Sequence, residues 1–293
     1  MSDAFRPLDH QSQWDVVHAV LAPTSGRSVE RNDLGWDSVV YVVDDGAVVV
    51  KFPRSEVAAA AYAREAAALS RIREAGLPVL VPSVRDFDGE RGILVLDGLV
   101  GRPLALDHAG DELLSDWGRQ LGTALAELHD LPADGLGLPV YDDAAQAEHF
   151  RSRLHASAEL LAPLPARARD GLAELILVEL PARLAAREHP AVLCHGDAGP
   201  WNMIVTAEGR LGLIDLGDAS LADPVLDFRF AWPPAMAAAV FDAYGADDAL
   251  RDLARLLAGL RPVLDLPGLH ARGDTRELQV ALAELAGFTA PDR

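Results

Sequence analysis

Three side chains able to handle a proton, a cation or a phosphate lie close together in VLCHGDAGPWNMIVTAEGRLGLID, residues 192–215. Asp197 lies in a loop that contains glycine and proline, Asn202 ends that loop, and Asp215 ends the second of two strand-like runs. A loop carboxylate can orient a hydroxyl and accept its proton. An amide oxygen beside a carboxylate is a pair of hard ligands that suits Mg²⁺ carrying phosphates. The segment therefore predicts chemistry on phosphate groups.

The two strand-like runs of this segment are expected to form a hairpin around Ala207-Glu208-Gly209. With the turn centred on Glu208 and Gly209, Asn202 and Asp215 become opposite residues. Their Cβ atoms would then be about 5 Å apart on the same side of the ribbon. The hairpin thus predicts a cation site shared by these two residues.

Lys51 is the only lysine among 26 basic residues, and all the others are arginine. A genome biased toward arginine codons replaces lysine wherever arginine serves, so a retained lysine indicates a position that needs a compact point charge. A cramped phosphate site is such a position. The alternative is an ordinary lysine on an exposed strand edge.

The rest of the chain divides into two regions that would position these residues. Up to residue 98, strand-like runs dominate around one alanine-rich helix, and beyond it the pattern is mainly helical. The expected strands are 38–43, 47–52 and 92–97, with a hairpin signal at Asp44-Asp45-Gly46, and the expected helices are 56–75, 110–130, 144–162, 166–187, 235–244, 247–260 and 274–286. The sequence therefore predicts an α+β protein with a small β-rich lobe at 1–98 and a larger helical lobe at 99–293.

In their order along the chain, these motifs resemble those of the aminoglycoside phosphotransferase family, whose members share the bilobal fold of the protein kinases. His195-Gly196-Asp197 stands where kinases have His-Arg-Asp, and Asp215-Leu216-Gly217 stands where they have Asp-Phe-Gly. Asn202 matches the metal-binding asparagine between the two motifs. The joint occurrence of the motifs in this order is specific, whereas each alone is weak.

The resemblance extends upstream and covers roughly residues 30–230. Gly35-Trp36-Asp37-Ser38 resembles the loop that covers the nucleotide phosphates, and VVVKF places Lys51 on the third strand. Glu65, followed four residues later by Leu69, matches the helix glutamate that pairs with this lysine; the competing interpretation is a solvated surface glutamate. The phosphate loop has one glycine where protein kinases have three, so its phosphate contacts are less well defined.

The resemblance implies a role for each candidate residue. Asp197 would receive the acceptor hydroxyl as the catalytic base, and Asn202 and Asp215 would hold one or two Mg²⁺ ions. Lys51 would bind the α- and β-phosphates, and Glu65 would fix its side chain. The remaining nucleotide contacts would come from Gly35 and Ser38 in the phosphate loop and from the backbone where the lobes join, at Leu96, Asp97, Gly98 and Leu99.

Other polar residues near these motifs are expected to support the structure rather than to react. His195 would support its loop, and His129 would support it from the core. Asp227 is interpreted as a helix cap or a brace for the catalytic loop, without a catalytic role. Trp201 is expected to pack rather than to recognise a ligand, and Cys194 to be a small buried apolar residue.

The expected reaction is transfer of the γ-phosphate of ATP or GTP to a hydroxyl of an aminoglycoside-type antibiotic. An acidic second lobe is compatible with a cationic acceptor, although acidic surfaces also serve solubility. Relatives in the family phosphorylate macrolides, choline, fructosamines, homoserine and thiamine, so these acceptors remain alternatives. A nucleotide-binding pseudokinase, or a metal-dependent hydrolase using His195, Asp197 and Asp215, is a further alternative. The segment after about residue 230 matches nothing, yet it lies where substrate choice is usually decided.

Composition, charge and sequence patterns argue against several other classes of protein. The formal net charge of −19 and pI near 4.7 argue against binding to nucleic-acid backbones. No apolar run approaches the roughly 18 residues that span a bilayer. The N-terminal residues lack the pattern of a secretion signal, and a single cysteine fits a reducing compartment. We therefore expect a cytoplasmic enzyme, monomeric or weakly dimeric, that binds neither nucleic acid nor membrane.

Overall fold

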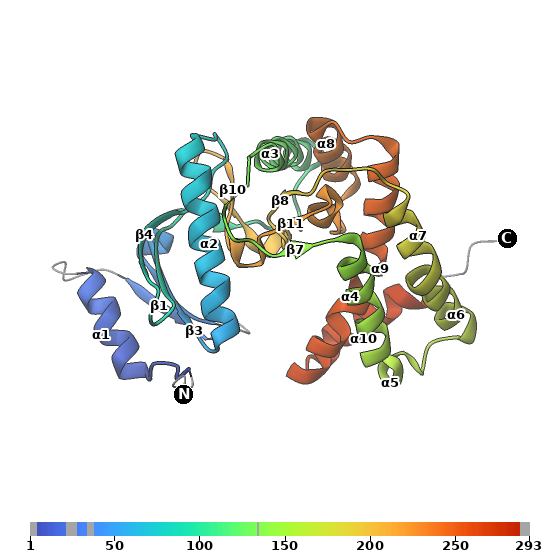
Figure 1. Cartoon of the computed structure of the whole chain (residues 1–293), viewed down its shortest axis with the longest axis horizontal. Coiled ribbons are helices and arrows are strands. Elements are labelled where there is room, and N and C mark those ends of the chain that lie inside the picture. The colour runs from blue at the N-terminus through green and yellow to red at the C-terminus, as the bar shows by residue number, and fades with distance from the viewer. Residues whose placement is uncertain (1–4, 22–27, 34–37, 134, 288–293) are drawn as a thin grey trace.

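The computed structural model describes residues 5–21, 28–33, 38–133 and 135–287 of the chain. It has the bilobal α+β fold that the sequence predicts, with the N-terminal elements at one end and the C-terminal helices at the other (Figure 1). Among the described residues, no helix has the length and apolar character needed to cross a bilayer.

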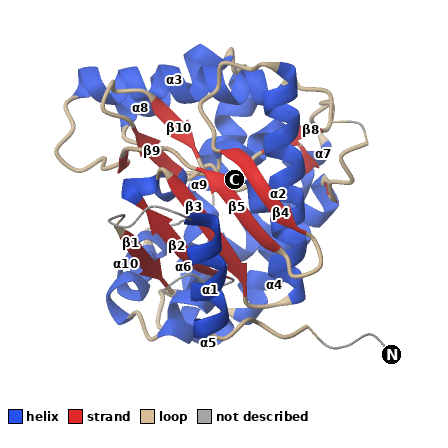
Figure 2. Ribbon diagram, turned by 90° about the vertical axis from the view of Figure 1, so that its left-hand side faces the viewer, coloured by secondary structure: helices blue, strands red, loops and turns tan. Residues whose placement is uncertain are grey.

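The N-terminal lobe is built on an antiparallel sheet of five strands in the order β1-β2-β3-β5-β4. Helices α1 and α2 flank it, and α1 lies in front of the strands in Figure 2. The elements of this lobe are α1 (His10–Leu21), β1 (Val29–Asn32), β2 (Ser38–Val43), β3 (Val48–Pro53), α2 (Glu56–Ala75), β4 (Ser83–Asp88) and β5 (Ile93–Asp97).

The alternation of side chains along β3 places Lys51 on the α2 side of the sheet. Val48, Val50 and Phe52 point the other way, into a core shared with α1. Helix α2 begins with the Ser55 hydroxyl capping an N–H group and ends where Gly76 adopts φ +67°. The strand and the helix that carry the predicted ion pair therefore face each other.

The C-terminal lobe is mainly helical, with two small sheets of three strands each, ordered β10-β9-β6 and β7-β11-β8. Its helices are α3 (Asp111–His129), α4 (Asp143–Ala156), α5 (Ala158–Leu161), α6 (Ala166–Glu174), α7 (Leu180–Ala185), α8 (Pro234–Tyr244), α9 (Asp248–Arg272) and α10 (Thr275–Ala286), and its strands are β6 (Arg102–Pro103), β7 (Val140–Tyr141), β8 (Val192–Cys194), β9 (Met203–Val205), β10 (Leu211–Leu213) and β11 (Ser220–Ala222).

Helices α3 and α8 approach closely because α3 presents two glycines to α8. A Cβ atom at Gly118 would lie 2.5 Å from the Met236 carbonyl oxygen, and one at Gly122 would lie 2.3 Å from the Val240 oxygen. No side chain fits in that space, which explains the glycines in an otherwise regular helix. The α3–α8 pair forms part of the core behind the loop 195–199.

The lobes meet through short backbone contacts. The Leu213 N–H donates to the Leu80 carbonyl over 2.9 Å, and Leu80 forms a β-bridge with Gly212. The chain leaves the five-stranded sheet after Asp97. The boundary at 98/99 remains a prediction.

The β9–β10 hairpin corrects the predicted register by one residue. Met203 pairs with Leu213, so Asn202 lies opposite Ile214, whose N–H donates to the Asn202 carbonyl over 3.0 Å. The predicted pairing of Asn202 with Asp215 is wrong. The turn has three residues instead of two, because Gly209 adopts φ +77° and its N–H bonds the Thr206 carbonyl.

Two predicted helices are divided and a third is extended. A π-helical turn, Leu175–Glu179, separates α6 from α7, and a break at Ser157 separates α4 from α5. Helix α9 continues to Arg272 through two prolines, Pro262 and Pro267. We attribute its continuation to the burial of an apolar face, which offsets the cost of proline inside a helix.

Candidate active site

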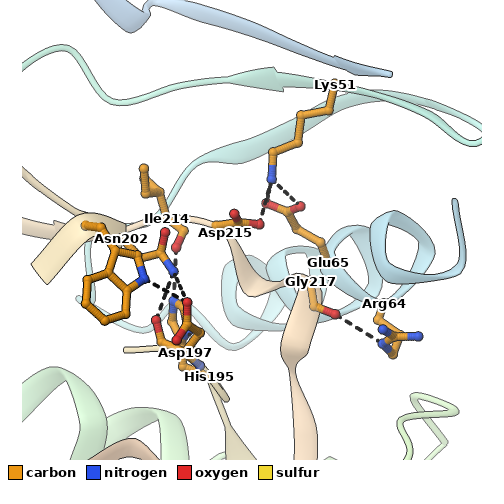
Figure 3. A network of polar contacts seen from close by, with 10 residues as sticks. Lys51, Arg64, Glu65, His195, Asp197, Asn202, Ile214, Asp215 and Gly217 are labelled. Carbon is orange, nitrogen blue, oxygen red and sulfur yellow. Dashed lines mark hydrogen bonds and ion pairs between the residues drawn. The ribbon is translucent and has the colours of Figure 1, made fainter. Parts of the chain in front are cut away.

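A largely buried ion-paired group joins the two lobes. Lys51 Nζ lies 2.9 and 2.6 Å from the two carboxylate oxygens of Glu65, and 2.9 Å from Asp215 Oδ1 (Figure 3). The Glu65 side chain is fully buried, that of Lys51 is 9% exposed, and that of Asp215 is 51% exposed. The predicted Lys51–Glu65 pair is present, and Asp215 is its third member.

The charges in this group stabilise one another. Burial alone would lower the pKa of Lys51, but the carboxylates of Glu65 and Asp215 overcome this effect and raise it above its ordinary value. Burial would raise the pKa of Asp215, but the Lys51 ammonium holds it below its usual value. Lys51 is therefore a fixed cation and Asp215 a fixed anion at neutral pH.

A second contact holds helix α2 against the Asp215-Leu216-Gly217 segment. Arg64, next to Glu65, donates from Nε to the Gly217 carbonyl oxygen over 3.2 Å. The helix that carries Glu65 is thus tied to the segment that carries Asp215. The two contacts together fix the position of Lys51 relative to the second lobe.

The loop 195–199, which carries the candidate base Asp197 and is called here the candidate catalytic loop, begins where β8 ends and is held by a buried carboxylate. Asp227 accepts hydrogen bonds from the backbone N–H groups of His195 (2.7 Å) and Gly196 (2.8 Å), and its Oδ2 lies 3.0 Å from His129 Nε2. The His129 hydrogen bond helps to keep the pKa of Asp227 low although burial opposes this shift. His129 also contacts the Tyr244 hydroxyl at 2.9 Å. The predicted supporting roles of Asp227 and His129 are confirmed.

His195 supports the loop as predicted, because its fully buried ring bridges two segments. Its Nε2 lies 3.0 Å from the Ile214 carbonyl oxygen, and its Nδ1 lies 3.3 Å from the Asp197 N–H. A neutral ring with the proton on Nε2 satisfies both contacts. Gly196 adopts φ +84°, and a Cβ there would lie 2.2 Å from the Asp218 carbonyl oxygen, so only glycine fits.

The Asp197 carboxylate receives donors from the residues that follow it. Asn202 Nδ2 donates to Oδ2 over 2.9 Å, and Trp201 Nε1 donates to the same oxygen over 2.8 Å. The Asp197 side chain is 22% exposed, and the guanidinium of Arg261 stands 3.7 Å from Oδ1. The carboxylate is therefore oriented but open to a ligand.

The residues predicted to bind a cation offer suitable atoms. Asn202 turns its amide nitrogen toward Asp197 (Figure 3), which leaves its amide oxygen as a possible ligand. Asp215 leaves the hairpin with φ +66°, and both residues border the same cavity despite the shifted register. Oxygen donors of this kind fit Mg²⁺.

A cavity of about 1010 Å³ joins these groups to the C-terminal helices. Five of the predicted site residues border it: Ser38, Lys51, Asp197, Asn202 and Asp215. Arg261 of α9 lines it beside Asp197, and its far end is lined by Asp265, Asp274, Glu277 and Glu284, from α9, α10 and the turn between them. The cavity thus extends from the candidate phosphate-binding residues to the C-terminal helices.

The other predicted nucleotide contacts lie outside this cavity. Glu65 lies behind Lys51, and Leu96, Asp97, Gly98 and Leu99 do not border the cavity. The Gly98 N–H donates to the Ala47 carbonyl over 3.1 Å, so this group is already used within the sheet and cannot also serve a purine. Gly35 lies outside the described residues.

The sequence did not predict the contacts that two residues make with Asp197. Trp201 was expected to pack, yet it is 53% exposed and bonds the candidate base. The sequence signal for this hydrogen bond is the position of Trp201, four residues after Asp197. Arg261 follows the predicted end of its helix at residue 260, and nothing in the sequence connects it with Asp197.

The family model for the phosphotransferase enzyme family matches residues 28–263. The chain belongs to this family. It is a kinase-type phosphotransferase that acts on hydroxyl groups of small molecules, and the predicted family is thereby confirmed. A comparison with curated proteins finds no match.

Solved structures share the fold of this phosphotransferase over nearly its whole length. The GDP and kanamycin complex of APH(2″)-IIIa superposes with a TM-score of 0.74 at 20% identity, covering 94% of this chain and 97% of that one. The gentamicin complex of APH(2″)-IIa gives 0.73 at 17% identity, covering 96% of each chain. The macrolide 2′-phosphotransferase MphH from Brachybacterium faecium gives 0.68 at 21% identity, covering 97% of this chain and 99% of that one.

Proposed function

We propose that this phosphotransferase transfers the γ-phosphate of ATP or GTP to a hydroxyl of an aminoglycoside-type antibiotic and thereby inactivates it. The observation that carries the proposal is that Lys51, Asp215 and the partly exposed carboxylate of Asp197 border one and the same cavity. A phosphate-binding cation, a cation ligand and a proton acceptor thus border the space in which two substrates could meet.

The N-terminal lobe would bind the nucleotide, with the boundary near residues 98 and 99. Lys51 remains charged because of Glu65 and Asp215, so it can bind the α- and β-phosphates. Phosphate oxygens would replace Asp215 as a partner of Lys51 and leave that carboxylate free for a cation. Ser38 and Gly35 would contact the phosphates, and the backbone at 96–99, without the Gly98 N–H, would contact the base.

Asn202 and Asp215 would hold Mg²⁺ through the amide oxygen and the carboxylate. When bound, the ion would neutralise charge on the phosphate oxygens during transfer. Contacts within the protein hold both side chains. Asn202 is fixed by its hydrogen bonds to Asp197, and Asp215 is fixed by its ion pair with Lys51.

Asp197 would orient the acceptor hydroxyl and accept its proton. The hydrogen bonds on Oδ2 fix the carboxylate plane, and the rigid loop held by Asp227 fixes its distance from the phosphate end. Orientation of this kind is a large part of catalysis in phosphoryl transfer, because the enzyme mainly positions the reactants.

Acidic residues at the far end of the cavity support a cationic acceptor. Asp274, Glu277 and Glu284 line that end from α10 and the turn before it, and carboxylates near a cleft concentrate cations. Two solved structures with this fold contain kanamycin or gentamicin. Both observations favour an acceptor that carries amino groups.

A macrolide is the second candidate acceptor. Macrolide 2′-phosphotransferases share the fold over nearly the whole chain. The same end of the cavity also contains apolar groups, Leu264, Leu269 and Val280, and Val280 is 46% exposed. These residues offer contacts to a large apolar ring.

An assay of nucleotide consumption tests the proposal. Purified protein is mixed with Mg²⁺ and ATP or GTP, and with aminoglycosides, macrolides, choline, fructosamine, homoserine and thiamine in turn, and the phosphorylated product is identified by mass spectrometry. We expect an aminoglycoside to give the highest kcat/KM. Phosphate release without any phosphorylated acceptor would instead indicate a hydrolase, and nucleotide binding without turnover would indicate a pseudokinase.

Asp197→Asn provides the mechanistic control. We expect kcat to fall by about 10²–10⁴-fold with nucleotide affinity largely kept, because the proton acceptor is lost. Asp170→Asn, an exposed aspartate on α6, should leave kcat unchanged. Turnover retained in the Asp197 variant would remove this residue from the mechanism.

A further inference from the structure

The two carboxylate oxygens of Asp197 have different surroundings. Oδ2 accepts two hydrogen bonds, from Trp201 Nε1 at 2.8 Å and from Asn202 Nδ2 at 2.9 Å. Oδ1 has no hydrogen-bond donor among the described residues, and the nearest cation is Arg261 Nη2 at 3.7 Å. This separation is longer than a hydrogen bond, so Oδ1 is the oxygen left open to a ligand.

Trp201 is an unusual donor because most of its ring is outside the core. The residue is 53% exposed, borders the cavity, and packs its ring edge-to-face against Phe230 with centroids 5.5 Å apart. An indole N–H can only donate a hydrogen bond. The ring thus fixes one oxygen of Asp197 while it forms part of the cavity wall.

The Arg261 side chain is held by several contacts, but not all of its N–H donors have a hydrogen-bond partner. Its guanidinium lies 5.3 Å from the Trp201 ring centroid and 4.9 Å from that of Phe230, and Nε contacts both oxygens of Asp265 at 3.3 Å. Its Nη1 is buried and has no hydrogen-bond partner within the described part of the chain. Nη1 is closed off from the cavity, so Nη2, which lies 3.7 Å from Asp197 Oδ1, is the nitrogen that can donate to a ligand oxygen in the cavity that Arg261 borders.

We infer that Trp201 and Arg261 prepare Asp197 for its substrate from the acceptor side. Trp201 is a positioning residue that occupies Oδ2 and makes Oδ1 the proton acceptor. Arg261 binds an oxygen of the acceptor next to the reacting hydroxyl. This inference rests on the proposed function and adds the reactive oxygen of Asp197 and a requirement on the acceptor.

The bond changes follow from this arrangement. The acceptor oxygen forms a bond to the γ-phosphorus as the bond from that phosphorus to the β–γ bridging oxygen breaks. The hydroxyl proton passes to Oδ1 of Asp197, and the nucleoside diphosphate leaves. Arg261 takes no proton because a guanidinium keeps its charge in proteins.

The charge of Arg261 restricts which hydroxyl can react. A guanidinium offers only donors, so it binds a neighbouring hydroxyl, ether or carboxylate oxygen and repels an ammonium group. The acceptor is therefore a molecule in which the carbon next to the reacting hydroxyl carries an oxygen. Amino groups of the same molecule would lie toward the acidic residues of α10.

Trp201→Phe, with Trp232→Phe as its matched control, tests the positioning role. Trp232 belongs to the same aromatic group, with its ring centroid 6.2 Å from that of Phe230, and its Nε1 makes no hydrogen bond within the described part of the chain. We expect Trp201→Phe to lower kcat for kanamycin about 10- to 100-fold, while KM for the nucleotide stays within about twofold. Trp232→Phe should change neither value by more than about threefold. Equal effects of the two variants would overturn the inference.

Hydrolysis of Mg·ATP by water keeps this test independent of the acceptor. Water would give its proton to the same oxygen of Asp197, so Trp201→Phe should slow this reaction as well and Trp232→Phe should not. A wild-type protein that hydrolyses ATP but phosphorylates no acceptor contradicts the proposed function alone. Unchanged hydrolysis in Trp201→Phe contradicts the positioning role.

Arg261→Gln tests the acceptor contact. We expect KM for the acceptor to rise about tenfold or more with nucleotide KM unchanged, and Arg261→Lys to give an intermediate effect. Arg255→Gln, an exposed arginine on the same helix, should have no effect. NMR of the product should place the phosphate on a hydroxyl whose neighbouring carbon bears oxygen. A phosphate flanked only by amino-bearing carbons would exclude the role given to Arg261.

Discussion

Lys51 Nζ lies 2.9 Å from Asp215 Oδ1, although 164 positions separate the two residues in the chain. The lysine belongs to the five-stranded sheet and the aspartate to the segment after β10, so this contact crosses between the lobes. Glu65 holds the same ammonium from α2. The candidate phosphate-binding cation and the candidate metal ligand are therefore held together by the fold itself.

Lys51→Arg tests whether a compact charge is required at this position. We expect kcat/KM to fall about 100-fold or more, nearly as far as in Lys51→Ala, because a planar guanidinium does not fit between Glu65 and Asp215. Steady-state kinetics with calorimetric measurement of nucleotide binding checks this expectation. A fully active arginine variant would contradict the argument from the single lysine.

Asp227→Asn tests the brace of the candidate catalytic loop. The buried carboxylate accepts two backbone N–H bonds and contacts His129, and we expect its loss to lower the free energy of unfolding by about 2–4 kcal/mol at pH 7. Asp170→Asn, on the surface, should change it by less than about 0.5 kcal/mol. Denaturant unfolding monitored by circular dichroism measures both values.

The difference in the free energy of unfolding between wild type and Asp227→Asn should change with pH in a definite direction. The pKa of Asp227 is lowered in the fold, so its contribution is complete above the ordinary aspartate pKa of 3.8 and is lost as the pH falls through the lowered value. The gap in stability between wild type and Asp227→Asn should therefore narrow below about pH 4. If this difference in the free energy of unfolding instead grew as the pH fell, the ionised carboxylate would not stabilise the fold.

Local patterns were sufficient to predict the elements that carry most of the site. Runs of β-branched apolar residues predicted β2 and β3, and the alanine-rich run ending at Gly76 predicted α2, whereas the pairing of Lys51 with Glu65 came from the family resemblance. Elements without a strong apolar pattern were missed. Strand β1, for example, is mostly exposed, and β6 has only two residues.

Features that depend on tertiary packing could not be predicted in the same way. The register of the β9–β10 hairpin turned on the positive φ of Gly209, which selects a three-residue turn. The contact of Arg261 with Asp197 depends on α9 continuing beyond residue 260, where the sequence predicted the helix to end before Pro262. In both cases long-range burial or a single backbone angle decides a side chain's position.

Cys194 provides a final test because it is the only cysteine and lies directly before the candidate catalytic loop. Its side chain is fully buried against Ala222 and Leu226, and burial raises the pKa of the thiol well above its ordinary value. A thiol reagent at pH 8 should therefore label the native protein far more slowly than the urea-unfolded chain, with Cys194→Ala as the blank. Asp227→Asn should speed native labelling, since the loss of the brace makes opening of this segment easier. Labelling of the native wild type as fast as of the unfolded chain would show that β8 opens freely, and the rigid candidate catalytic loop on which the position of Asp197 depends would not exist.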